Sequence, residues 1–186
     1  IGFAIYEFEV WSAQSAPVSQ SEPENLALNK PVSASSQMRA GTVTSYFKNA
    51  TDGNPATKWM SEVGDKQTIT VDLEANATVN KIIIDWVDPG VQYKIQVSPN
   101  NYDWIDIAEI TKGTADNREF SVNNVVARYI RMSGTKAMYG PNYSIREIEV
   151  YGKWGGVPAP IVKKLTEEDR IELKSGEELK PNEFIY

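Results

Sequence analysis

The residues best suited to chemistry are oxygen donors grouped around one tight turn. Asp52, Gly53 and Asn54 are consecutive, and Thr57 follows three residues later. Glycine permits the sharp backbone that turns carbonyl groups inward. Ca²⁺ takes six to eight oxygen ligands from carboxylates, carbonyls and hydroxyls, so this segment could supply part of a calcium site. The same residues also suit an ordinary Asp-Gly turn that binds nothing.

The chain has no cysteine and no histidine. Their absence excludes a thiolate nucleophile, a Ser-His-Asp triad and the usual Cys/His zinc sites. A bound metal would therefore have to be held by oxygen, which favours a hard cation. Acidic residues are plentiful, but no two of them stand out as the facing carboxylates that a glycosidase needs. We therefore expect no enzymatic activity.

The net charge of the chain argues against two classes of binding partner, nucleic acids and anionic membranes. The chain has 19 basic and 25 acidic residues, a formal charge of −6. An acidic protein is not attracted to nucleic acid or to an anionic membrane, so no nucleic-acid partner is expected. A membrane-binding loop needs apolar residues flanked by basic ones. Only Met38 beside Arg39, and Met138 near Lys136, come near that pattern, so membrane binding is not favoured.

Short alternating segments, separated by turn residues, run through the middle of the chain. They cover residues 68–73, 79–86, 91–97, 104–110, 120–122, 127–133 and 143–151. Strands recurring in this way, without a long helical period, predict an all-β sandwich or barrel. We expect residues 25–152 to form this domain, which is large enough to fold without a disulfide.

The flanks of this domain look different. Residues 4–11 match residues 144–151 without a gap. This match indicates that residues 1–12 are the last strand of a preceding repeat of the domain. The alternative is that the two segments are unrelated strands of similar composition. Residues 13–24, rich in Ser, Ala, Gln, Pro and Glu, are typical of a linker. We interpret residues 153–186 as a linker followed by the start of a further module or a tail.

Six phrases in a fixed order resemble the discoidin family, also called coagulation factor V/VIII type C. They are residues 25–32, 50–59, 69–73, 93–104, 128–131 and 145–152. The chain is most similar to the bacterial branch, the carbohydrate-binding modules appended to glycoside hydrolases. Vertebrate members usually join the two ends of the domain by a disulfide, which this chain cannot form. The resemblance implies an eight-stranded antiparallel jelly-roll β-sandwich of the galactose-binding-like kind, with structural Ca²⁺ and a ligand site on the loops at one end.

The family pattern also implies a ligand set for the metal. Asp52 and Glu147 would give their carboxylates, and Thr57 both its carbonyl and its hydroxyl. Backbone carbonyls would complete the site, from Asn49, Asn54 and Arg146. Two carboxylates would neutralise one Ca²⁺ ion.

A carbohydrate site needs aromatic faces for stacking and planar polar groups for hydroxyl pairs. The loops at the ligand end would be residues 37–47, 61–66, 86–91 and 136–142. They offer seven candidates: Arg39, Tyr46, Glu62, Trp86, Asp88, Tyr139 and Asn142. Trp86 is also in phase with the apolar residues before it, so it could equally belong to the core, and Tyr143 shares that ambiguity. Galactose-binding relatives often use a histidine, so galactose is not favoured.

The sequence thus predicts a non-catalytic carbohydrate-binding module of a multimodular, secreted bacterial enzyme. Its partners would be a neutral or acidic oligosaccharide or polysaccharide, bound weakly, and other modules of the same chain, including a tandem copy. Its location would be extracellular, periplasmic or at the cell surface. The alternative is a cell-adhesion or phospholipid-binding discoidin domain, for which membrane binding would be expected.

Overall fold

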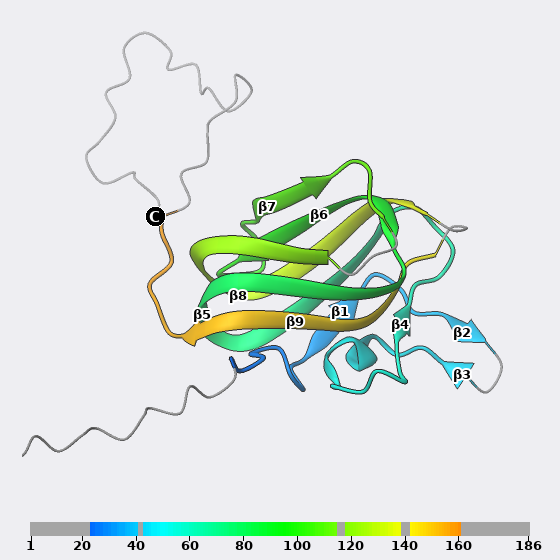
Figure 1. Ribbon diagram of the computed structural model, residues 1–186, viewed down its shortest axis with the longest axis horizontal. Coiled ribbons are helices and arrows are strands. Elements are labelled where there is room, and N and C mark those ends of the chain that lie inside the picture. Colours follow the sequence, from blue (N-terminus) through cyan, green and yellow to red (C-terminus); the bar gives the residue numbers. More distant parts are fainter. Residues whose placement is uncertain (1–22, 41–42, 115–117, 139–141, 161–186) are drawn as a thin grey trace, which may run out of the picture.

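The structure is a computed structural model, and it describes residues 23–40, 43–114, 118–138 and 142–160 (Figure 1). Within these residues the chain forms nine strands and one short 3-10 helix. The predicted repeat strand at 1–12 and most of the two predicted flanking segments lie outside them. The elements are β1 (Val32–Ala34), β2 (Arg39–Ala40), β3 (Val43–Thr44), η1 (Phe47–Thr51), β4 (Trp59–Met60), β5 (Gln67–Asp88), β6 (Gly90–Ser98), β7 (Ile105–Ile110), β8 (Arg118–Ala137) and β9 (Ser144–Trp154).

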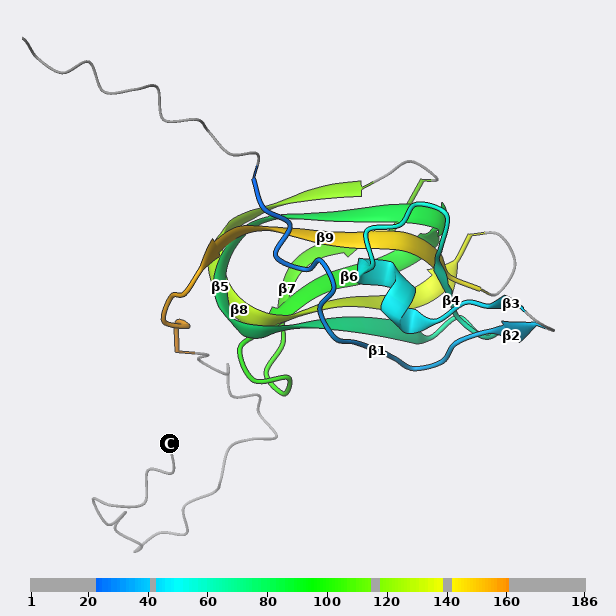
Figure 2. The ribbon, with the colours of Figure 1, turned by 90° about the horizontal axis from the view of Figure 1, so that it is seen from below.

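One antiparallel sheet of seven strands folds back on itself to make a sandwich. Its order is β4-β9-β5-β8-β6-β7, and β1 pairs with β5 beside this path. The long strands β5 and β8 belong to both layers, because each curls from one layer into the other (Figure 2). The first layer holds β1, β6, β7 and one half of each long strand. The second holds β4, β9 and the other halves.

This arrangement confirms the all-β sandwich and corrects the predicted strand count. The separate strands expected at 68–73 and 79–86 are continuous in β5, and those expected at 120–122 and 127–133 are continuous in β8. Together with β1 and β4, which the alternating segments did not include, these strands form a main sheet of seven, against the eight that the family resemblance implied. Glu74, with φ 67°, and Asn124, with φ 50°, take left-handed backbone conformations inside these strands. Such residues bend a strand sharply without ending it.

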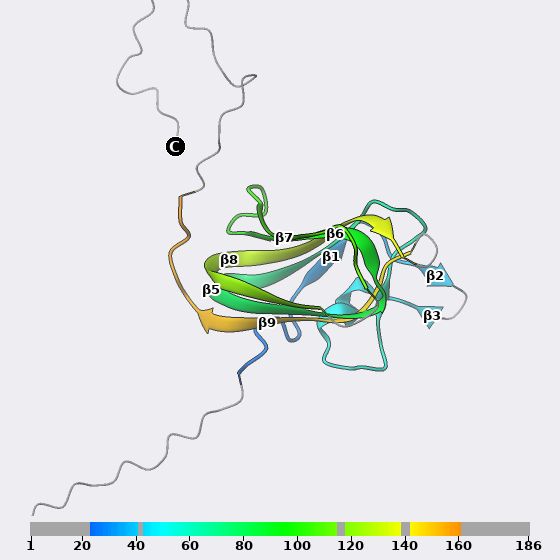
Figure 3. The same ribbon diagram turned by 45° about the horizontal axis from the view of Figure 1, so that its top comes forward.

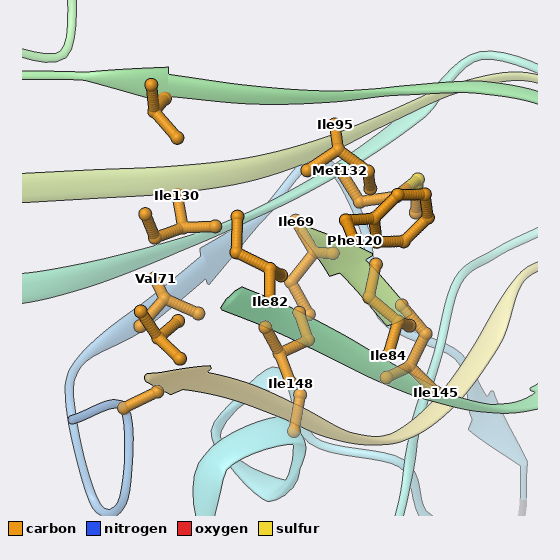
Figure 4. Close-up of a cluster of buried hydrophobic side chains, with 14 of the residues drawn as sticks. Ile69, Val71, Ile82, Ile84, Ile95, Phe120, Ile130, Met132, Ile145 and Ile148 are labelled. Atoms are coloured by element: carbon orange, nitrogen blue, oxygen red, sulfur yellow. The ribbon is translucent and has the colours of Figure 1, made fainter. Parts of the chain in front are cut away.

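Alternation of buried and exposed residues builds the core between the layers. In β5, Ile69, Val71 and Leu73 are fully buried, while the residues between them are only partly buried. Isoleucines from both layers meet there, together with Phe120 and Met132 (Figure 4). Burial of this apolar surface is the main force that holds the two layers together.

The two ends of the sandwich carry different parts of the chain. The β2–β3 hairpin projects at one end of the sandwich, and the segment after β9 leaves at the opposite end (Figures 1 and 3). At the second end, the amide of Leu26 donates to the carbonyl of Val150 over 2.8 Å, so the N-terminal segment is tied to the last strand. No helix among the described residues is long and apolar enough to cross a membrane.

Candidate metal and ligand sites

The predicted metal residues gather beside η1, which contacts both β1 and β9. Asn49 lies on η1, Asp52 ends it, and Gly53 follows with φ 70°. A Cβ atom on Gly53 would lie 2.8 Å from Leu28 Cδ1. The left-handed backbone favours glycine at this position, whereas the neighbouring atom is the end of a flexible, exposed side chain that can shift.

Hydrogen bonds fix the turn from Asp52 to Thr57. Asp52 Oδ1 accepts the amide hydrogen of Asn54 over 2.9 Å. The Thr57 hydroxyl lies 2.8 Å from Asp52 Oδ2 and 2.9 Å from the Asn54 carbonyl oxygen. Asn49 is held separately, because its side-chain amide donates to the Lys58 carbonyl over 3.1 Å. The turn thus brings a carboxylate, a hydroxyl and a carbonyl together.

Glu147 completes this group from β9. Its side chain is buried, and neither carboxylate oxygen has a hydrogen-bond partner within the described structure. Burial, and next the neighbouring carboxylate of Asp52, raise the pKa of Glu147 to about 7. The amides of Gly53 and Asn54 lie near these oxygens without meeting hydrogen-bond geometry, and they oppose this shift without cancelling it. Asp52 is only partly buried, but the two neighbouring carboxylates repel each other, and a cation between them would favour the ionised form of both.

Arg146 does not supply that cation. Its guanidinium donates to Asp85 Oδ1 and to the carbonyl of Trp86, each over 3.2 Å. Arg146 could therefore reach a metal only through its backbone carbonyl, as the family pattern implies. In the described parts of the chain, no three Asp, Glu, His or Cys side chains group around a metal position. The site would therefore combine two carboxylates with neutral oxygens, a donor set that fits Ca²⁺.

Four of the predicted ligand residues lie at the end of the sandwich that carries the β2–β3 hairpin. The amide of Met38, next to Arg39, donates to the Met60 carbonyl over 2.7 Å. The Asn142 side chain donates to the Ser61 carbonyl over 2.8 Å, which places it beside Glu62. Asp88 ends β5, where it pairs with Ser144 of β9. Adjoining backbone segments thus carry four of the candidates: Arg39, Glu62, Asp88 and Asn142.

The aromatic candidates separate into three cases. Tyr46 is 42% exposed and remains available, with Lys48 Nζ 5.5 Å from its ring centroid. Trp86 is only 3% exposed and packs 5.2 Å from the ring of Tyr93, so it belongs to the core and corrects its assignment to the ligand site. The in-phase spacing with the apolar residues of β5 explains that burial. Tyr143 is likewise buried. Tyr139 lies outside the described residues.

Sequence reasoning missed the side chain that organises this end. Gln67 is buried at the start of β5, and its Oε1 accepts hydrogen bonds from the hydroxyls of Ser35, over 2.5 Å, and Ser36, over 2.7 Å. Its Nε2 donates to the Glu62 carbonyl over 3.3 Å. Ser36 Oγ also accepts the amide hydrogen of Glu62. A buried glutamine at a strand start matches no motif, so only the spatial arrangement identifies it.

Comparisons with known proteins agree with this architecture. The F5/8 type C domain pattern matches residues 31–148. Chitosan-binding module 1 of a chitosanase/glucanase from Paenibacillus sp. IK-5 is 35% identical, with a TM-score of 0.65 over 69% of this chain and 99% of that one. Module 2 of the same enzyme, solved with chitotriose, is 30% identical, with a TM-score of 0.65 over 69% and 100%.

A more distant structure shares the fold alone. It is a Clostridium perfringens module in complex with GalNAc-β-1,3-galactose, 20% identical, with a TM-score of 0.61 over 69% of this chain and 100% of that one. A comparison with curated proteins found no match. The pattern match covers more than half of the chain, and two relatives of at least 30% identity are spanned almost completely. The chain therefore belongs to the F5/8 type C, or discoidin, family.

Proposed function

We propose that this domain is a carbohydrate-binding module, and that it binds an oligosaccharide on the loops around Glu62, Asp88 and Asn142. The observation that carries the proposal is the 30–35% identity with chitosan-binding modules across their whole length. The local arrangement supports it, since carboxylate and amide groups lie on adjoining segments and the ring of Tyr46 is exposed. Such groups can pair with sugar hydroxyls.

An amino-sugar oligomer is the ligand that we favour. Chitosan is a polymer of glucosamine, whose amino groups carry positive charge at mildly acidic pH. Glu62 is exposed and Asp88 half-buried, so a carboxylate could pair with such an ammonium group. The formal charge of −6 acts in the same direction. This proposal replaces the neutral or acidic sugar that the sequence alone suggested.

Calcium would have a structural role here. An ion between Asp52 and Glu147 would join the turn after η1 to β9, and it would remove the repulsion between the two carboxylates. The unpaired oxygens of Glu147 support this assignment. Asn49, Asn54, Thr57 and Arg146 would supply the neutral oxygens.

The wider context is also a proposal. We propose that the domain serves a larger secreted bacterial enzyme by keeping it near a polysaccharide. The origin of both similar modules in a chitosanase/glucanase supports this role. Single shallow modules bind weakly, and a tandem copy would raise the apparent affinity.

Calorimetric titration with chitotriose tests the proposed ligand. We expect a dissociation constant nearer millimolar than nanomolar. This corresponds to a binding free energy on the order of −4 to −7 kcal/mol. Glu62→Gln should weaken binding at least fivefold, while Glu119→Gln, near the start of β8 where it pairs with Ile83 of β5, should leave it unchanged. N-acetylated chitotriose should bind less tightly than chitotriose. Binding to phosphatidylserine vesicles, with no binding to either sugar, would instead support the adhesion or phospholipid alternative.

A further inference from the structure

The outer face of the first layer carries a row of polar side chains across its strands. Ser33 of β1 pairs in register with Thr70 of β5, Thr70 with Arg131 of β8, and Arg131 with Gln96 of β6. Arg131 Nε donates to Gln96 Oε1 over 2.9 Å, and Gln96 Nε2 donates to Asp106 over 2.6 Å. These contacts hold planar polar groups in fixed positions on the face of the sheet that points away from the core.

A cavity of about 270 Å³ opens on this face. Its lining combines hydroxyl, carboxylate, amide and aromatic groups, from Ser33, Thr70, Asp72, Asn101 and Tyr129. Sites that enclose a drug-sized ligand usually measure roughly 300–1,000 Å³, so this one suits a single small unit such as one sugar ring. Asp72 lies five positions along β5 from Gln67 at the loop end, about 17 Å at the rise of a strand. The cavity is therefore distinct from the loop site.

Asp72 and Arg128 are pre-ordered at one side of this cavity. Arg128 Nε donates to Asp72 Oδ1 over 2.7 Å, and Nη2 donates to Oδ2 over 2.9 Å. This two-point pair holds the pKa of Asp72 below its usual value, so the carboxylate stays ionised and can accept further hydrogen bonds. The guanidinium of Arg128 also lies 5.1 Å from the ring centroid of Tyr129. The ring is thus supported by a charged group that is itself fixed.

Asn101 faces the cavity from a rigid turn. Ser98 Oγ accepts the amide hydrogens of Asn100 and Asn101, over 3.2 and 2.9 Å. Asn100 Oδ1 in turn accepts the amide hydrogen of Tyr102 over 3.0 Å. Asn101 itself has φ 66°, a conformation in which asparagine is tolerated. A ligand at this position would lose little free energy to ordering the turn.

We propose that this cavity is a second carbohydrate-binding site, in which one hexopyranose ring of an oligosaccharide stacks on Tyr129. Its hydroxyls pair with Asp72, Asn101 and Thr70. The aromatic ring supplies the apolar face, and the fixed carboxylate and amide supply orientation. Trp104, whose ring centroid lies 3.7 Å from Arg131 Cζ, continues the planar surface beyond Thr70 and Arg131. An oligosaccharide chain leaving the cavity across β8 would meet that surface.

Amide chemical shifts of the full chain, titrated with chitotriose, separate the two sites. We expect the amides of Thr70, Asn101 and Tyr129 to shift in addition to those around Glu62. In Glu62→Gln, the shifts around Glu62 should weaken while those on the sheet face persist. Asn101→Gly keeps the left-handed backbone and removes the side chain, so it should weaken the sheet-face response at least threefold and spare the loop response. Tyr129→Ala should abolish the sheet-face response.

Each result decides the proposal. If only the loop amides shift, or if the sheet-face shifts weaken together with the loop shifts in Glu62→Gln, the second site is refuted. If only the sheet face responds, the second site stands and the proposed loop site fails. If neither region responds to chitotriose or to its N-acetylated form, both are refuted for these sugars. Should Tyr129→Ala unfold, Asn101→Gly still decides the matter.

Discussion

Asn25 and Val150 join the beginning of the domain to its last strand: the side-chain oxygen of Asn25 accepts the amide hydrogen of Val150 over 3.0 Å. The same oxygen accepts the amide hydrogen of Ala27, also over 3.0 Å. One side chain thus caps a turn and closes the domain. A chain without cysteine cannot make that closure by a disulfide.

Replacing Asn25 should destabilise the domain more than a surface change would. Asn25→Ala leaves two amide hydrogens without their acceptor, so we expect a loss of about 1–3 kcal/mol in the free energy of unfolding. Urea denaturation measures it. Asn80→Ala, at an exposed position of β5, should change stability by less than about 0.5 kcal/mol. Equal effects from both variants would contradict a closing role for Asn25.

Calcium should stabilise the folded domain. An ion that binds only the native state raises the melting temperature by mass action, so adding a chelator should lower it. Asp52→Asn and Glu147→Gln should each remove the response to calcium. Glu149→Gln, two residues along the same strand, should keep it. A wild-type melting temperature that is the same in calcium and in chelator would exclude the proposed ion.

The pH dependence without calcium follows from Glu147. Its pKa is raised from 4.5 to about 7 in the folded domain, first by burial and then by Asp52. Between these values the folded state holds a proton that the unfolded chain has released. The free energy of unfolding should therefore fall as the pH rises through this window.

Urea unfolding in chelator, at about pH 5 and about pH 7.5, tests this sign. Glu147→Gln cannot lose a proton, so its stability should vary less between the two conditions. Saturating calcium should also reduce the fall, because the ion favours the ionised carboxylate. Stability that rises with pH in chelator, and does so equally in Glu147→Gln, would show that other groups govern the response.

Tyr143 should couple stability to sugar binding. Its buried hydroxyl donates to the Asp65 carbonyl over 2.6 Å, and its amide donates to Ser61 Oγ over 3.0 Å. Tyr143→Phe removes the first bond and frees the segment that carries Glu62. We expect a loss of about 1–2 kcal/mol in stability and weaker chitotriose binding. Tyr151→Phe, whose hydroxyl contacts Glu149 instead, should leave binding unchanged.

The sequence predicted the sandwich because burial alternates with a period of two, as in Ile69, Val71 and Leu73. It could not show that β5 and β8 run through both layers. Glu74 and Asn124 lie where the pairing of β5 with β8 shifts register, and only the three-dimensional structure shows that the strands continue past them. The strand period placed Trp86 equally well in the core, and tertiary packing decided between the two assignments.

The candidate metal site was partly predictable because most of its residues are local. Asp52, Asn54 and Thr57 lie in one turn, whose composition alone indicates oxygen ligands. The partner carboxylate of Glu147 is far away in sequence, and it was found through the family resemblance. The sheet-face cavity had no sequence signal at all, since Asp72, Asn101 and Tyr129 come from three distant segments.

Because the first turn is joined to the last strand, the two ends of the domain lie close together, and this affects how the domain can be connected to other polypeptides. Neighbouring ends allow a folded unit to be inserted into another polypeptide, or its ends to be moved elsewhere, with little strain on the host. New ends placed in the segment between β7 and β8, with the old ones linked, should give a folded permutant. The module could then be attached to different host proteins, and its ligand loops would point away from the attachment point in each of them.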